Sequence, residues 1–141
     1  AVEIERETGR VLIHRYASVH DVGRILNPII VEGQIRGGFA HGFGAAMFEE
    51  LAYDEDGNFL SGTFADYLCP TSADLPAIDF AHSRTDSPAN PLGSKGMGDG
   101  SSMLTPVVMA NAVSDALGRD DVELPLTLNK VWHMANEGAE T

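Results

Sequence analysis

A lysine and an aspartate lie within a glycine-rich run, GSKGMGDGSS, at residues 93–102. Lys95 would add positive potential for an anion, and Asp99 is the group in this run that can accept a proton. Glycine loses the most conformational freedom on folding, so this run indicates backbone with positive φ or in close contact with a ligand. The residue order matches neither a P-loop nor the G-x-G-x-x-G motif, so the loop alone identifies no ligand.

A helix is expected directly after this loop. Thr105 is typical of an N-cap and Pro106 of the first helical residue. Gly118 is typical of a C-terminal cap. The free N–H groups and the positive dipole end at the start of a helix favour a nearby anion. Loop and helix together therefore predict an anion site with one proton acceptor. A tight turn with a solvated aspartate is the competing interpretation.

A second glycine-rich segment, from Val31 to Leu51, carries a side-chain amide that could bind a ligand. Its apolar residues recur every four positions, as in a helix: Val31, Ile35, Phe39, Phe43 and Met47. Each of its five glycines costs a helix about 1 kcal/mol relative to alanine. This predicts a surface where another backbone or a flat ligand lies too close for a side chain. Gln34 lies on that surface, where its amide could bind a polar ligand or satisfy nearby backbone.

Short strands are expected to position these two segments. Alternating residues predict a β-hairpin from strands at 2–6 and 11–19, with Gly9 in its turn. A second hairpin turn and a short strand follow at 54–60, and a further strand at 78–84.

The last predicted element is a short helix with Leu128, Val131, Trp132 and Ala135 on one face and Gly138 beyond its end. The order of elements predicts a single α+β domain over residues 1–141. Short antiparallel strands and hairpins would pack with a glycine-rich central helix and two C-terminal helices.

Composition excludes several classes of function. The formal net charge of -12 argues against nucleic acid or an anionic membrane as a partner. The single cysteine, Cys69, excludes an iron–sulfur cluster held by this chain alone. No apolar stretch approaches the roughly 20 residues that span a bilayer, so we expect no membrane span and a reducing, cytoplasmic location. The absence of a starting methionine suggests a fragment of something longer.

The histidines do not predict a metal site. His20 lies beside Asp21, but the other histidines are scattered and no residue of this chain is expected to ligate a metal. His41, within the glycine-rich helix, is expected to be a packed or capped polar residue rather than a catalyst. No G-x-S-x-G motif accompanies these histidines, so nucleophilic catalysis is unsupported.

Four strings together indicate a family. They are DVGRILNP at 21–28, VEGQIRGGFAHGFGAAMFEE at 31–50, NPLGSKGMGD at 90–99 and LPLTLNKVW at 124–132. In order and spacing they resemble the C-terminal part of the large, molybdenum-binding subunit of the xanthine dehydrogenase, aldehyde oxidase and carbon monoxide dehydrogenase family. The resemblance implies the C-terminal molybdopterin-binding lobe of a molybdenum hydroxylase.

This resemblance also implies a cofactor, a reaction and partners. The cofactor would be molybdopterin, often as its cytosine dinucleotide, in a subunit that hydroxylates or oxidises a small substrate with oxygen derived from water. Electrons would leave through iron–sulfur and FAD subunits or domains. The remainder of the large subunit would complete the cofactor site. The isolated chain is therefore expected to be inactive and free of cofactor, with an open face that a second copy could cover in a homodimer.

Individual residues carry over from the family pattern. Gln34, beside Gly33, matches the glutamine that hydrogen-bonds the cofactor. The residues that match the loop lining the same site are Gly93, Ser94, Lys95, Gly96 and Gly98. Asp99 falls where the family has a glutamate that acts as general base, and it is one methylene shorter. A displacement of about 1 Å can cost roughly 10²-fold in rate. Two interpretations remain: a working hydroxylase with a shifted loop, or a non-catalytic scaffold that has lost the base.

Overall fold

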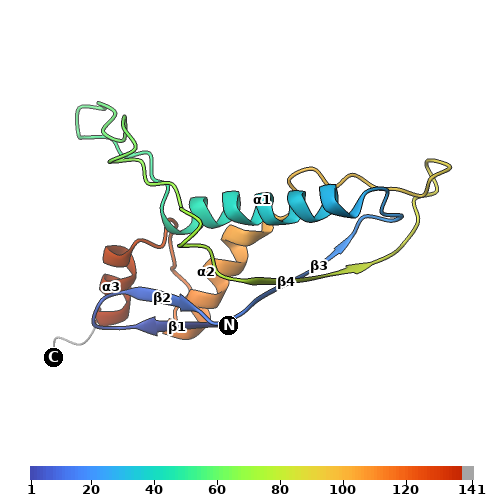
Figure 1. The fold of residues 1–141 in the computed structure, drawn as a ribbon. Coiled ribbons are helices and arrows are strands. Elements are labelled where there is room, and N and C mark those ends of the chain that lie inside the picture. The colour runs from blue at the N-terminus through green and yellow to red at the C-terminus, as the bar shows by residue number, and fades with distance from the viewer. Residues whose placement is uncertain (138–141) are drawn as a thin grey trace.

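Seven elements make up the part of the chain that the computed structural model describes, residues 1–137. They are β1 (Val2–Glu5), β2 (Arg10–Ile13), β3 (Tyr16–Asp21), α1 (Pro28–Met47), β4 (Ile78–Ser83), α2 (Leu104–Leu117) and α3 (Leu128–Asn136) (Figure 1). This order confirms the predicted α+β class, with short strands and three helices. The long helix α1 extends along one side of the molecule, above the β3–β4 pair.

The first hairpin is shorter than predicted. Strands β1 and β2 pair antiparallel, with Val2 opposite Ile13, and Gly9 lies in the turn as expected. The predicted strand over 11–19 is wrong as a single element, because the chain leaves the hairpin after Ile13. The N–H groups of His14 and Arg15 both donate to the carbonyl of Ala1, at 3.0 and 3.3 Å, and β3 then starts as a separate strand.

The second sheet corrects the expectation of antiparallel strands throughout. Strands β3 and β4 pair in parallel, with Tyr16 opposite Ile78 and Asp21 opposite Ser83. A parallel pair needs a long crossover between its strands, and here α1 and the segment after it provide that connection. Strand β4 itself confirms the strand predicted at 78–84.

The segment after α1 is largely irregular. The predicted turn at 54–58 is present, and the N–H of Gly57 donates to the carbonyl of Asp54 at 3.0 Å. The short strand expected after it is reduced to an isolated bridge between Tyr53 and Phe59. In Figure 1 this segment projects beyond the C-terminal end of α1.

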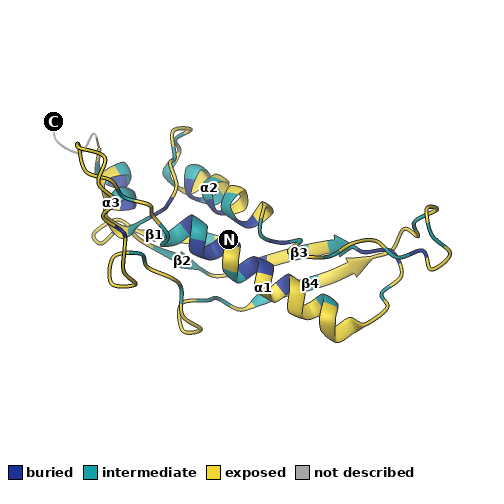
Figure 2. Ribbon diagram, turned by 90° about the horizontal axis from the view of Figure 1, so that it is seen from above, coloured by how far each residue is buried: buried dark blue, intermediate teal, exposed yellow. Residues whose placement is uncertain are grey.

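Helix α1 buries the predicted apolar stripe through its later turns. Asn27 caps its start, with its side-chain oxygen accepting from the N–H of Ile30. Ile35, Phe39 and Phe43 are buried, whereas the first two turns of the helix are exposed (Figure 2). Phe39 and Phe43 pack with Tyr16 of β3 in one cluster. A second cluster joins all three helices: Ala46, Met109, Val113, Leu126 and Val131.

Helix α2 begins before its predicted cap. Its first residue is Leu104, so the expectation that Thr105 is the N-cap is wrong. Thr105 is fully buried instead, and its hydroxyl donates to the carbonyl of Ser101 at 2.8 Å. The Tyr16 hydroxyl is hydrogen bonded to the Thr105 hydroxyl oxygen at 3.1 Å, so packing against β3 determines the role of this threonine. Gly118 ends the helix in the left-handed conformation, as predicted.

Helix α3 is present, but its predicted face is only partly buried. Val131 and Ala135 contact the core, while Leu128 and Trp132 are 59% and 40% exposed. The predicted helix is thus confirmed, and the Val131 and Ala135 part of its apolar face is buried. Gly138, predicted beyond the helix, lies outside the described residues. No helix within the described chain is long and apolar enough to cross a membrane.

Two glycines of α1 provide a matched test of this packing. A Cβ at Gly42 would lie 2.6 Å from the Ser102 carbonyl oxygen and 2.8 Å from Thr105 Cβ, whereas a Cβ at Gly37 would meet nothing within 4 Å. We expect Gly42→Ala to lower the free energy of unfolding by about 1–3 kcal/mol. Gly37→Ala should raise it by about 0.5–1 kcal/mol through helix propensity. Chemical denaturation measures both, and equal effects of the two variants would contradict this packing.

Candidate functional site

The C-terminal part of the loop at residues 93–102 lies against α1. The N–H of Asp99 donates to Gln34 Oε1 at 3.0 Å, which joins two predicted site residues 65 positions apart. Gly38 lies one turn further along α1, where a Cβ would come within 3.3 Å of Asp99 C and 3.1 Å of Ser101 N. The prediction that another backbone lies against the helix glycines is thus confirmed at Gly38 and Gly42.

Asp99 has an unusual backbone conformation. Its φ of 53° lies in the left-handed region, which costs most L-residues roughly 1–2 kcal/mol and which aspartate tolerates better than most. Its carbonyl accepts from the N–H and the hydroxyl of Ser102, at 3.1 and 2.8 Å. The Asp99 side chain is 57% exposed, and its Oδ2 lies 3.7 Å from Nδ1 of His41 on α1. The backbone of this acid is therefore held on both sides while its carboxylate faces solvent.

The start of the loop is fixed by backbone contacts. Gly93 has a φ of 68°, and its carbonyl accepts from the N–H groups of Arg24 and Ser87, at 3.1 and 3.0 Å. Gly23, also at positive φ, packs so closely that a Cβ there would collide with this carbonyl oxygen. Of the two alternatives predicted for the loop glycines, positive φ is found at Gly93 but not at Gly96, Gly98 or Gly100, for which close approach to a ligand stays a prediction.

Lys95 pairs with Asp21 at the end of β3. Its Nζ donates to Asp21 Oδ2 at 3.0 Å, while Oδ1 of the same carboxylate accepts from the N–H groups of Gly23 and Thr85, at 2.8 and 3.1 Å. These backbone hydrogen bonds, with the lysine, hold the pKa of Asp21 well below its usual value. The lysine thus fastens the loop to the β3–β4 sheet.

The middle of the loop is open. A Cβ at Gly96 or Gly98 would meet nothing within 4 Å, and the same is true at Gly33 on α1. Within residues 1–137, the N–H groups of Gly96, Met97 and Gly98 have no acceptor. The loop therefore offers unpaired donors and free space beside the helix that carries Gln34.

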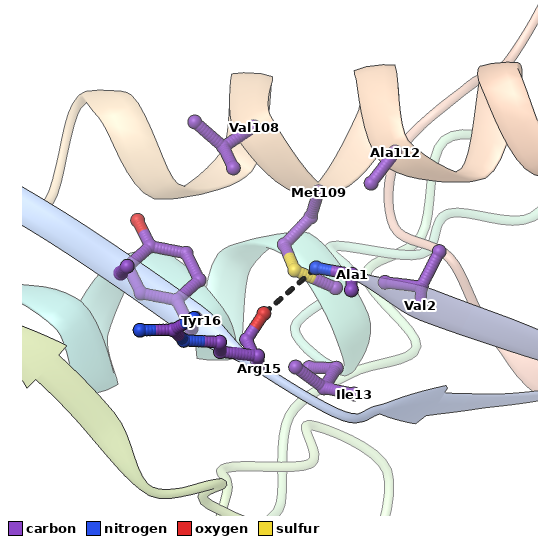
Figure 3. A pocket seen from close by; sticks show the side chains of 9 residues that line it. Ala1, Val2, Ile13, Arg15, Tyr16, Val108, Met109 and Ala112 are labelled. Carbon is purple, nitrogen blue, oxygen red and sulfur yellow. Dashed lines mark hydrogen bonds between the residues drawn. The ribbon is translucent and has the colours of Figure 1, made fainter.

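A cavity of about 420 Å³ lies elsewhere in the molecule, between α2 and the β2–β3 junction. Tyr16, Val108 and Met109 line it, and the amino group of Ala1 donates to the Arg15 carbonyl at 2.8 Å beside it (Figure 3). None of the predicted site residues lines this cavity. A smaller pocket of about 250 Å³ is lined by two of the predicted site residues, Ser94 and Lys95, together with residues of the 22–31 segment.

Two residues that fix the loop were not assigned a role from the sequence. Asp21 precedes Gly23 by two residues, which is the spacing of an Asx turn and could have indicated a capping carboxylate. Asn90 donates from Nδ2 to the Ser94 carbonyl at 2.9 Å and accepts at Oδ1 from the Ser94 N–H. Only the folded chain reveals that both residues hold the same loop.

Known proteins resemble this chain in sequence and in structure. A family model described as a molybdopterin cofactor-binding domain matches residues 1–76. The chain is 44% identical to the nicotine 6-hydroxylase large subunit of Paenarthrobacter nicotinovorans and 34% identical to the carbon monoxide dehydrogenase large chain of Hydrogenophaga pseudoflava. These matches cover 92% and 96% of the chain but span 16% and 17% of the relatives' lengths.

A crystal structure of a Cu,Mo-CO dehydrogenase aligns with a TM-score of 0.93 at 32% identity, over 99% of this chain and 18% of that one. The fold and the family match thus define a segment of a molybdopterin-binding oxidoreductase subunit. The chain belongs to the molybdopterin cofactor-binding family of the xanthine dehydrogenase, carbon monoxide dehydrogenase and aldehyde oxidoreductase large subunits.

The residues of the site fit such a cofactor. A phosphate-bearing cofactor needs backbone N–H donors and room for close approach, and Gly96 to Gly98 supply both. The Gln34 side chain uses its oxygen for Asp99 and keeps its NH₂ group available to a ligand. Lys95 is already paired with Asp21, so the donors to an anion would be the backbone groups rather than this ammonium.

Removing the Asp21 carboxylate should loosen the loop. In Asp21→Ala we expect faster hydrogen exchange at the amides of Gly23 and Thr85, because both lose their acceptor. Asp79→Ala is the matched control, since its ion pair with Arg15 is exposed on both sides and should contribute little. Unchanged exchange at both amides in Asp21→Ala would contradict this role.

The same carboxylate predicts a pH dependence. Because folding lowers the pKa of Asp21, its contribution to stability is present at neutral pH and is lost as the pH falls below about 4 toward the lowered pKa. Acid unfolding of the wild type should therefore be steeper below this pH than that of Asp21→Ala. Identical dependence of stability on pH below about 4 in the two proteins would show that protonation of Asp21 does not affect folding.

Proposed function

We propose that this chain forms part of the catalytic subunit of a molybdenum hydroxylase that oxidises a small substrate. When bound, the cofactor supplies a two-electron oxidation, in which the substrate gains an oxygen atom from water and releases two electrons and two protons. The family membership supports the cofactor, and the chain would act within a longer large subunit. The activity of that whole subunit, its substrate and the dinucleotide form of the cofactor belong to this proposal.

The observation that carries the proposal is the hydrogen bond from the Asp99 N–H to Gln34 Oε1. It places a proton acceptor beside the amide expected to contact the cofactor, at the edge of a loop with unpaired backbone donors. The Asp99 carboxylate accepts one of the two released protons. Gln34 donates from its NH₂ group to the cofactor, and Gly33, Gly96 and Gly98 leave room for it.

The other predicted loop residues act through the shape of the loop. Gly93 and Ser94 form the close contact with Gly23, and Lys95 holds the loop to Asp21. Together they fix the direction in which the 96–98 backbone presents its N–H groups. We therefore assign these three residues to the cofactor site as its support.

Exposed apolar surface supports assembly into a larger subunit. Large apolar side chains are exposed on the first turn of α1 and along α2: Ile29, Ile30, Met103, Leu104, Val107 and Val108. Patches of this kind are usually covered in the functional protein. In this proposal the remainder of the subunit covers them, and a second copy is the alternative cover. Electrons pass from the cofactor to iron–sulfur and FAD subunits or domains.

A non-catalytic scaffold is the second candidate, and one observation favours it. Asp99 replaces the longer glutamate that the family pattern has at this position, and its carboxylate makes no hydrogen bond among residues 1–137. A site that had lost its function would keep the fold without a positioned base.

Substitution of Asp99 in the full-length protein separates the two candidates. Asp99→Asn keeps the size of the side chain but removes the proton acceptor, so we expect kcat to fall by about 10²- to 10⁴-fold. Molybdenum content should stay near the wild-type value, because the backbone contacts of residue 99 remain. Turnover is measured with nicotine, carbon monoxide and an aldehyde, using a redox dye as electron acceptor.

Asp115→Asn on the exposed side of α2 is the control and should match the wild type. Asp99→Glu gives the sharper result, since a loop arranged for aspartate should lose rate with the longer acid. A higher rate in Asp99→Glu would favour the scaffold that has lost its base. Full activity in Asp99→Asn would exclude Asp99 as the proton acceptor.

A further inference from the structure

His41 lies on the same side of α1 as Gln34 and Gly38. The three residues are spaced by four and three positions, which places them along one helix face. Gly38, in the middle, lets the backbone of residues 99–102 approach α1 between the other two side chains. The helix therefore presents an amide on one side of Asp99 and an imidazole on the other.

The backbone of Asp99 is fixed, but its side chain is not. The N–H is bound by Gln34, and the carbonyl by both donors of Ser102. Two side-chain torsions remain to decide where the carboxylate points. Ordering a mobile carboxylate before each reaction costs conformational entropy. A neighbour that restricts these two torsions therefore favours catalysis.

His41 is the basic side chain within reach of this carboxylate. Its Nδ1 lies 3.7 Å from Asp99 Oδ2, and a movement of about 1 Å would bring the pair to the 2.7–2.9 Å of a charge-assisted hydrogen bond. Other nearby cations are engaged elsewhere. Lys95 pairs with Asp21, and the Arg36 guanidinium lies 5.1 Å from the ring centroid of Phe80.

We propose that His41 is a positioning residue for Asp99. Its imidazole N–H holds one carboxylate oxygen toward α1, which directs the other oxygen toward the open side of the loop. This compensates for the shorter acid, because the direction of the carboxylate is set from the helix as well as from the loop. The inference rests on the proposed function of Asp99 as proton acceptor, and it goes beyond the expectation that His41 is a packed or capped polar residue.

The first test needs no substrate. Crystal structures of the full-length protein and of its His41→Ala variant would compare the Asp99 side chain. We expect one rotamer in the wild type, with an oxygen within hydrogen-bond distance of His41, and several rotamers in the variant. The inference is overturned if Asp99 keeps a single, unchanged rotamer without the imidazole.

The second test uses turnover of the substrate that the full-length protein oxidises fastest among nicotine, carbon monoxide and an aldehyde. His41→Ala should lower kcat by about 10- to 100-fold, with KM and molybdenum content unchanged. His41→Gln should recover much of the rate, since an amide can donate to the carboxylate. His14→Ala is the control, because that exposed histidine pairs with Glu3 on the first hairpin.

A double variant distinguishes this inference from the proposed function. With Asp99→Asn in place, His41→Ala should cause no further loss, because the two residues act through one carboxylate. If Asp99→Asn is inactive while His41→Ala retains full kcat, only the role of His41 fails. If Asp99→Asn is fully active, the proposed function fails first. Loss of molybdenum or of thermal stability in His41→Ala would show a structural role instead.

Discussion

The close approach of the 99–102 backbone to α1 is the contact on which the site depends. At Gly38 and Gly42 the loop backbone occupies the space that side chains would need. The helix gives up about 1 kcal/mol of propensity at each glycine for this proximity. This contact brings the Asp99 N–H within hydrogen-bond distance of Gln34. It also leads the chain into α2, where the Thr105 hydroxyl is hydrogen bonded to Tyr16 of the buried aromatic cluster.

The glycine-rich loop is rigid at its ends and open in its middle. Its start is closed on itself by Asn90, bound to Arg24 and Ser87 through the Gly93 carbonyl, and held to the end of β3 by the Asp21–Lys95 pair. Its end is held to α1 by Gln34. Among the described residues, the N–H groups of the 96–98 backbone between these anchors have no acceptor, and a Cβ at Gly96 or Gly98 would meet nothing within 4 Å. Fixed ends allow these donors to meet a ligand without a large ordering cost, which is the advantage of a preorganised site.

Local patterns in the sequence were sufficient to predict several elements of the fold. The four-residue spacing of Ile35, Phe39 and Phe43 predicted α1, and Gly118 predicted the end of α2. The parallel pairing of β3 with β4 could not be predicted, because it depends on which distant segments meet. The role of Thr105 also depends on a distant segment. Its sequence context favours a helix cap, but in the folded chain its hydroxyl is hydrogen bonded to the buried Tyr16 hydroxyl.

The site was predicted in parts. The glycine run and Gln34 each suggested a ligand, and the family resemblance supplied a role for Asp99. The contacts that join them span 65 and 74 residues, between Gln34 and Asp99 and between Asp21 and Lys95, and no local pattern encodes such pairs. His41 lacked any signal of its own, because its relation to Asp99 exists only once Gly38 lets the loop approach.

A structure of the full-length protein with its cofactor bound would test the central claim most directly. The account predicts the cofactor beside the Gly33 side of α1 and the 96–98 backbone, with the Asp99 carboxylate facing it and the Asp99 N–H still bound to Gln34. A cofactor bound away from this surface, or an Asp99 turned away from it with the Gln34 contact broken, would contradict the account.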